Sequence, residues 1–160
     1  MTRTNTVDLD LLEGMTFRAR TGSGHELVVD SGADSFGGNA GARPVELVLL
    51  ASAACMAMDA VSILRKMRQD VRAYHVHAEG TRAAEHPRVF TAITLTHRFD
   101  GDVRAANAAR ALQLSMTRYC PVFAMLSPTV PIRVTYEIAL PDGAVVSGEV
   151  ERERPEAAAG

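Results

Sequence analysis

The sequence has no tryptophan, few aromatic residues of any kind and almost no net charge. Three isolated tyrosines (Tyr74, Tyr119 and Tyr136) provide no stacking platform for single-stranded nucleic acid. The 17 Lys and Arg residues against 19 Asp and Glu residues give a formal net charge of −2. A protein dedicated to binding nucleic acid or anionic membranes needs a basic face. We therefore expect this protein to belong to neither class.

Long hydrophobic runs are also lacking. The longest charge-free stretch in the apolar middle, Leu47 to Met58, has twelve residues, whereas a membrane-spanning helix needs about 20. The N-terminus (MTRTNTVDLDLLEG) has no apolar run behind a basic start, so no secretory signal is expected. We therefore expect a cytoplasmic protein. In that reducing compartment its two cysteines are buried thiols, metal ligands or redox groups rather than a structural disulfide.

The chain does contain enough apolar residues to fill a core. Hydrophobic residues make up 47% of it and charged residues 22%, which distinguishes it from a disordered tail. A length of 160 residues indicates one domain. We predict a single domain over residues 1–150, followed by a charged and then alanine-rich tail at 151–160 that frays.

Alternating residues predict a series of short strands separated by turns. These strands are expected at 7–12, 15–20, 25–30, 72–82, 88–99, 132–140 and 144–150. Helices are expected at 44–70 and 102–119, with a short helical piece after Cys120-Pro121. Strands that come in runs with short connections indicate an antiparallel α+β fold rather than a doubly wound sheet.

The helix that opens at Pro44 is unusual because its residues from Leu47 to Met58 are apolar or small all the way round. A helix that lies on one sheet needs only one apolar stripe, so this helix should be covered on most sides. The simplest solution is a homodimer in which the central helices of both chains are sandwiched between sheets. The alternative is that the second helix and one sheet already cover it.

The two cysteines lie in apolar surroundings, Cys55 in the middle of this helix and Cys120 directly before Pro121. Free cysteines are often simple core residues. As a functional pair they would need a thiolate to attack peroxide, a second thiol to condense with the sulfenic acid, and a reductant. A helix N-terminus could stabilise a Cys120 thiolate, whereas Cys55 would need a cation from another segment, most plausibly an arginine.

Several motifs carry a family resemblance. They are PVEL (44–47) with ASAAC (51–55), YCPV (119–122), GSGHELVVD (22–30), SILRKMRQDV (62–71) and PRVFTAITL (87–95). Over residues 7–139 the sequence resembles the OsmC/Ohr family, and its YhfA-type branch in particular. The resemblance implies an OsmC-like α+β fold, with antiparallel sheets wrapped around two central helices in an intertwined homodimer.

The resemblance also implies a function. Enzymes of this family reduce organic hydroperoxides with external thiols, often dihydrolipoyl groups, and use no metal or bound cofactor. Cys55 would then be the peroxidatic cysteine and Cys120 the resolving one. In the family an arginine from the N-terminal strands or the following loop pairs with the thiolate, and a glutamate directly after the motif proline orients that arginine.

This sequence departs from that pattern around Pro44. Val45 follows the proline and the acid comes one residue later, at Glu46, about 100° further round a helix. Glu46 is therefore either the orienting acid or an acid that stabilises the first helical turn. Arg18 is the first choice for the arginine, and Arg20 and Arg43 are the alternatives. The remaining alternative is that all three are solvated surface charges and none meets the thiol.

Two further hypotheses follow from the residues. One is a non-catalytic OsmC-like dimer that senses redox state or binds a small apolar ligand. In the peroxidase, Phe36, Met56, Met58, Phe123 and Met125 could instead line an apolar pocket that prefers organic over hydrogen peroxide, or each could simply fill the core. The other is a metal site on a strand face with His75, His77 and Glu79, joined by His97 from a neighbouring strand. A solvated polar face is the favoured interpretation of these histidines, so we expect no metal.

Overall fold

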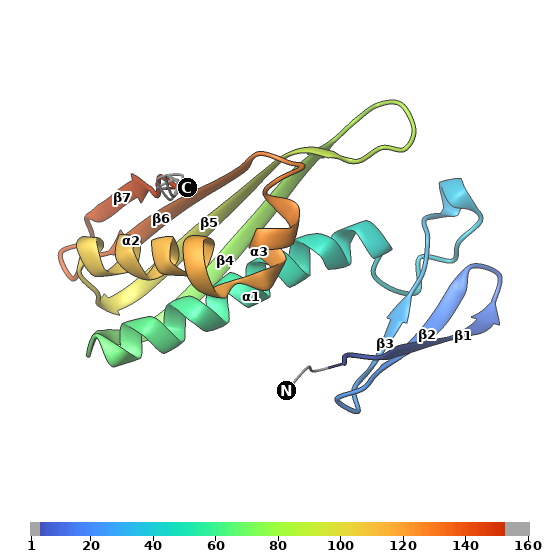
Figure 1. The fold of residues 1–160 in the computed structure, drawn as a ribbon, viewed down its shortest axis with the longest axis horizontal. Helices are drawn as coiled ribbons and strands as arrows, with labels where there is room; N and C mark the ends of the chain where they lie inside the picture. The colour runs from blue at the N-terminus through green and yellow to red at the C-terminus, as the bar shows by residue number, and fades with distance from the viewer. Residues whose placement is uncertain (1–3, 153–160) are drawn as a thin grey trace, which may run out of the picture. The chain divides into compact units, whose positions relative to one another are not determined.

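The structure is a computed structural model that describes residues 4–152. The chain divides into two compact units, with the boundary between Val48 and Leu49. From residue 153 onward, the tail predicted at 151–160 lies outside the described residues. Each unit is described separately below, and Figure 1 labels the elements.

The N-terminal unit contains a three-stranded antiparallel sheet in the order β1-β2-β3. Its strands are β1 (Val7–Glu13), β2 (Thr16–Thr21) and β3 (Glu26–Val29). The register places Asp10 opposite Arg18 and Leu11 opposite Phe17. Because side chains alternate between faces, the charged residues gather on one face of the sheet and the apolar ones on the other.

The glycine-rich segment after β3 is organised around the buried side chain of Asp30. Its carboxylate accepts hydrogen bonds from the backbone N–H groups of Ala40 (2.9 Å), Ser31 (2.7 Å) and Gly38 (3.1 Å), and from the Thr16 hydroxyl (3.1 Å). These bonds, that of Ala40 foremost, hold the pKa of Asp30 below its ordinary value. A short 3-10 turn, η1 (Ala33–Ser35), lies in the same segment.

The C-terminal unit contains a four-stranded sheet in the order β4-β5-β6-β7. Its strands are β4 (Asp70–Arg82), β5 (Phe90–Asp102), β6 (Ile132–Ala139) and β7 (Val145–Glu149). The pair β5–β6 is parallel and the other pairs are antiparallel. A parallel pair requires a long crossover, which the helices between these two strands provide. The sheet is therefore mixed, whereas the sequence predicted antiparallel pairing throughout.

The helical segments of this unit lie on one face of the four-stranded sheet (Figure 1). They are α1 (Pro44–Lys66, entering from the N-terminal unit), α2 (Ala105–Leu114), the π-helical turn η2 (Ser115–Tyr119) and α3 (Pro121–Leu126). The core between helices and sheet contains Met56 and Leu64 of α1, Leu112 of α2, Leu95 of β5 and Ile138 of β6. The predicted α+β fold class is confirmed.

One chain covers only a single stripe of α1. The buried residues of the helix, Ser52, Met56, Ala60 and Leu64, recur every four positions and so lie along one face. On other faces Leu50 is 61% exposed and Met58 is 68% exposed. By length and composition alone α1 would pass as a membrane span, but the core helix of a soluble protein meets the same criterion. In this structure the buried stripe of α1 packs into the core of the C-terminal unit, and 28% of the apolar window is buried.

Candidate functional site

The structure brings the two cysteine sulfurs together. Cys55 lies in the middle of α1 and Cys120 lies between η2 and α3, yet their Sγ atoms are within 4.8 Å of each other. Both cysteines are free. Cys55 is half-buried and Cys120 is 2% exposed. The pair that the sequence singled out is therefore a pair in space, on segments 65 residues apart.

Local structure explains where Cys120 lies. The residue before a proline is disfavoured in helical conformation, and Cys120 accordingly has extended dihedral angles (φ −77°, ψ 104°). It ends η2, where its N–H donates to the Ser115 carbonyl at 2.9 Å. It also caps α3, whose first residue is Pro121, because its Sγ accepts a hydrogen bond from the Phe123 N–H at 3.2 Å.

The ionisation of Cys120 departs from the expectation that a helix N-terminus would favour its thiolate. Burial, together with the neighbouring Cys55 thiol, raises the pKa of the Cys120 thiol to about 12. The hydrogen bond from Phe123 acts in the opposite direction but is outweighed. Cys120 therefore remains a protonated thiol at neutral pH, and in that form it can donate a hydrogen bond to Cys55.

A third side chain, Asp59, completes the group. One of its carboxylate oxygens lies within 4.8 Å of both sulfurs. Asp59 follows Cys55 by one helical turn, so the two share a face of α1. The hydroxyl of Ser115, a buried residue at the start of η2, donates a 2.8 Å hydrogen bond to Asp59 Oδ2. In the C-terminal unit the charge beside the sulfurs is thus a carboxylate.

The sequence interpretation missed Asp59, although a signal was present. It is the only charged residue between Glu46 and Arg65, inside a helix that is otherwise apolar. A lone charge one turn after a cysteine points to the same face as that cysteine. Only the fold, however, shows that Cys120 and Ser115 approach this face.

Glu46 interacts with Arg43 in the N-terminal unit. Its carboxylate accepts the Arg43 backbone N–H at 2.9 Å and lies 3.4 Å from the Arg43 guanidinium. Glu46 is the third residue of α1, and a carboxylate at this position that accepts the N–H before the helix forms half of a capping box. This arrangement stabilises the start of α1 and also holds an arginine.

The two arginines of β2 have different surroundings. Arg20 is in ion pairs with Glu26 at 2.7 Å and Asp10 at 3.6 Å. Arg18 is half-buried, and within residues 4–152 its guanidinium has no ion pair or hydrogen bond. Arg18 belongs to the N-terminal unit and Cys55 to the C-terminal unit. A contact between these two side chains stays a prediction.

The histidine metal site is not supported in the form proposed from the sequence. The register pairs Val76 with His97 and places both on the inner face of the sheet, whereas His75 and His77 are exposed on the outer face. His97 is fully buried, and its Nδ1 is 2.5 Å from the Tyr74 hydroxyl. Burial lowers the pKa of His97 to about 4, so it is neutral at pH 7.

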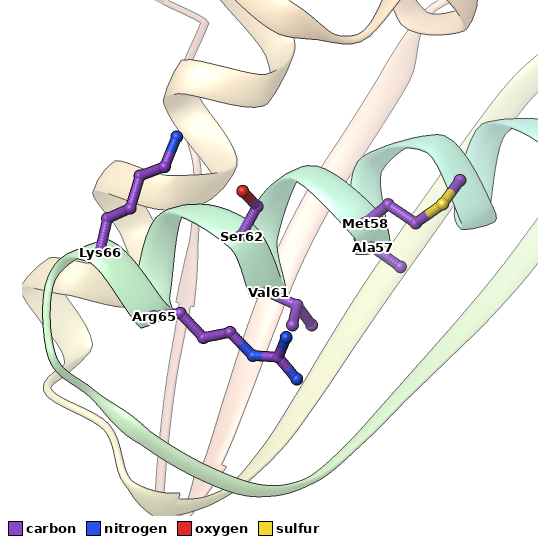
Figure 2. Close-up of a pocket in the computed structure, with 6 residues that line it drawn as sticks. All are labelled: Ala57, Met58, Val61, Ser62, Arg65 and Lys66. Carbon is purple, nitrogen blue, oxygen red and sulfur yellow. The ribbon is translucent and has the colours of Figure 1, made fainter.

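The apolar residues suggested for a ligand pocket do not form one surface. Met56 and Phe123 are buried in the core, while Met58 and Met125 are exposed and Phe36 is 94% exposed. A groove of about 610 Å³ does run along the outer side of α1 (Figure 2). Its lining is Ala57, Met58, Val61, Ser62, Arg65 and Lys66. Neither cysteine lines it, so the groove is separate from the sulfur pair.

Comparison with known proteins agrees with this fold. Residues 37–135 match the family described as OsmC-like protein. Protein YhfA of Escherichia coli K12 is 41% identical over 128 residues, which cover 79% of this chain and 92% of YhfA.

Solved structures share the fold. A hypothetical protein from Aquifex aeolicus has 28% identity and a TM-score of 0.77, over 86% of this chain and 97% of its own. An organic hydroperoxide resistance protein from Legionella pneumophila has 14% identity and a TM-score of 0.66, over 88% of this chain and 99% of its own. From the matched family and the extent of identity to YhfA, the chain belongs to the OsmC-like protein family.

Proposed function

We propose that this protein is a thiol-dependent peroxidase that reduces organic hydroperoxides, with Cys55 as the peroxidatic and Cys120 as the resolving cysteine. The observation that carries the proposal is the separation of the two sulfurs, at most 4.8 Å. A structural neighbour in the same family is named as an organic hydroperoxide resistance protein, which supports this substrate class.

The proposed cycle has three steps. The Cys55 thiolate attacks one oxygen of ROOH, the O–O bond breaks, and the leaving RO⁻ takes a proton to become ROH. The Cys55 sulfenic acid then condenses with the Cys120 thiol, which forms a disulfide and releases water. An external dithiol, of dihydrolipoyl type in this proposal, reopens the disulfide and is itself oxidised. Balanced in this way, the cycle needs no metal or bound cofactor.

The protonation of the two thiols suits these roles. Burial and the raised pKa keep Cys120 as a thiol, and a resolving cysteine should not compete with the peroxidatic one for the hydroperoxide. A protonated Cys120 also donates a hydrogen bond to Cys55. Full activation requires a cation as well.

Arg18 remains our choice for that cation, with Glu46 as the acid that completes the arrangement. Arg20 and Arg43 already have carboxylate partners, whereas the half-buried Arg18 side chain has none among residues 4–152. A half-buried guanidinium without a counter-ion is more readily available to a thiolate than one already in an ion pair.

We further propose that the functional unit is a cytoplasmic homodimer, each chain folded as one domain over residues 1–150. Two surfaces within the chain support the dimer. Leu9 and Leu11 on the apolar face of the N-terminal sheet are exposed, and so are Leu50 and Met58 on α1. Exposed apolar surface of this kind is typical of protein–protein interfaces.

The proposal is tested by following consumption of cumene hydroperoxide by the purified chain with dihydrolipoamide as reductant. We expect turnover that Cys55→Ser abolishes. Cys120→Ser should permit one round of reduction and then leave an oxidised Cys55. Ser62→Ala, on the exposed side of α1, is the matched control and should match the parent chain. Turnover that survives Cys55→Ser would refute the proposal.

The second candidate is a redox sensor, and the carboxylate of Asp59 beside both sulfurs favours it. A nearby negative charge opposes thiolate formation and slows attack on peroxide. A sensor would form the Cys55–Cys120 disulfide stoichiometrically with hydroperoxide but would not turn over with dithiol. The assay above separates the two functions, because only a peroxidase consumes many equivalents of hydroperoxide per chain.

A further inference from the structure

We propose that Cys55, Cys120 and Asp59 form a binding site for one Zn²⁺ ion in the reduced protein. The two sulfurs and a carboxylate oxygen lie within 4.8 Å of one another. In the part of the chain that the structure describes, no other group of three histidine, cysteine, aspartate or glutamate side chains brings ligand atoms this close. The inference uses the same cysteines as the proposed function but does not depend on peroxide reduction.

The spacing of the three atoms fits a tetrahedral zinc ion after a small adjustment. Zn–S bonds of about 2.3 Å and Zn–O bonds of about 2.0–2.2 Å place neighbouring ligand atoms about 3.5–3.8 Å apart. The largest separation in the group is 4.8 Å at most, so the atoms need to approach one another by about 1.5 Å or less. Cys55 and Asp59 are one turn apart on α1, a spacing that directs both side chains to one ion.

Two of the ligands are already oriented by hydrogen bonds. The Ser115 hydroxyl donates to Asp59 Oδ2 at 2.8 Å, which leaves the other carboxylate oxygen available. The Phe123 N–H donates to Cys120 Sγ at 3.2 Å. Ser115 and Phe123 are both buried. Metal sites in proteins depend on such outer partners, which fix the orientation of the ligands.

The chemistry of the ligands selects zinc. Two thiolates disfavour Mg²⁺ and Ca²⁺, which require oxygen ligands, and the carboxylate disfavours Cu⁺, which prefers an all-sulfur site. Zn²⁺ accepts both ligand types and is commonly held by three protein side chains with one open position. Binding one Zn²⁺ releases the two thiol protons to solvent, with no change in oxidation state. The sulfurs that hold zinc cannot at the same time form a disulfide.

The experiment uses the full chain, reduced and freed of metal, and titrates it with Co²⁺ as a spectroscopic probe and then with Zn²⁺. We expect one Co²⁺ per chain, a near-ultraviolet sulfur-to-cobalt charge-transfer band and the intense visible bands of tetrahedral Co²⁺, all abolished by stoichiometric Zn²⁺. Cys55→Ser and Cys120→Ser should each weaken the charge-transfer band. Asp59→Asn should lower Zn²⁺ affinity at least about tenfold, since even outer-shell partners contribute about 10–100-fold.

Two controls make the result decisive. Asp102→Asn makes the same change at an exposed position of β5 and should bind Zn²⁺ as the parent does. Reduced parent chain alkylated with N-ethylmaleimide should lose the site without any substitution. The inference is overturned if the reduced chain binds no Co²⁺ or Zn²⁺, if Asp59→Asn binds like Asp102→Asn, or if alkylation leaves affinity unchanged. Peroxide reduction by the metal-free chain is measured separately, so zinc binding and peroxidase activity can fail independently.

Discussion

Replacing Asp59 by asparagine should make Cys55 more reactive. Asparagine removes the negative charge beside the sulfurs but keeps an amide oxygen that can accept the hydrogen bond from Ser115. Two unit charges 4.8 Å apart repel by about 0.9 kcal/mol at the dielectric constant of water and by about 3.5 kcal/mol at an effective value of about 20. The rate at which Cys55 is alkylated should therefore rise at least about fourfold.

The assay is the rate of alkylation of Cys55 by iodoacetamide at neutral pH, with Cys120→Ser as the common background so that only one thiol reacts. The thiolate is the reactive form, so the rate reports its fraction. Asp102→Asn in the same background is the control and should leave the rate unchanged. A rate for Asp59→Asn equal to or below that of the background would refute the placement of the carboxylate beside the sulfur, provided thermal melts show both variants folded.

Four further predictions concern stability and assembly. Burial raises the pKa of Cys120 to about 12, so the stability that its thiol form contributes is full below the ordinary thiol pKa and is lost as pH rises toward 12. In urea unfolding of the reduced chain, the free energy of unfolding should fall by about 1–2 kcal/mol between about pH 8 and pH 10. This fall should be smaller in Cys120→Ser. Burial lowers the pKa of His97 to about 4, so the stability that its neutral form contributes is present above about pH 6.5 and is lost toward pH 4. At about pH 5 the free energy of unfolding should be about 2 kcal/mol lower than at neutral pH, and His97→Gln should diminish this loss. An unchanged pH profile in that variant would count against this role of His97. Met56→Ala, in the core, should cost about 2–5 kcal/mol of unfolding free energy. Met58→Lys, at an exposed position, should leave the chain folded but convert the proposed dimer to monomers, as measured by sedimentation. A dimer that persists in Met58→Lys would exclude α1 from the interface.

Much of the local structure could be predicted from the sequence because it depends on local patterns. Proline at its first position and a first-turn acid predicted where α1 begins, and the structure starts that helix at Pro44. The predicted end at residue 70 was too late: α1 ends at Lys66, and Arg68 has a positive φ of 57° that no helix accommodates. The alternating strands were found because a half-buried sheet imposes a period of two.

Features that depend on pairing between distant segments were not predicted. The parallel pairing of β5 and β6 joins segments that the helices separate in the sequence. The antiparallel register of β4 and β5 places His97 on the face opposite His75 and His77, which alternation within one strand cannot show. The predicted continuous helix to residue 119 becomes a π-helical turn from Ser115, and this turn directs the Ser115 hydroxyl to Asp59.

In the candidate site, too, features set by local sequence could be predicted, and features set by contacts between distant segments could not. Cys55 and Cys120 were selected from their motifs, and the structure places their sulfurs near each other. The half capping box of Glu46 and Arg43 has a spacing that is visible in the sequence, where a first-turn role for Glu46 was one of two alternatives. Asp59 was recognised only as the end of a charge-free stretch, because its importance comes from a sulfur 61 residues away in the chain.

The proposed function requires the sulfurs of Cys55 and Cys120 to bond directly. The measurement is peptide mapping by mass spectrometry after the reduced, metal-free chain has reacted with one equivalent of cumene hydroperoxide. We expect a cross-linked pair of peptides containing Cys55 and Cys120, with the loss of two hydrogens. A sulfinic or sulfonic acid on Cys55 beside an unmodified Cys120 thiol, or two intact thiols, would contradict the proposed function.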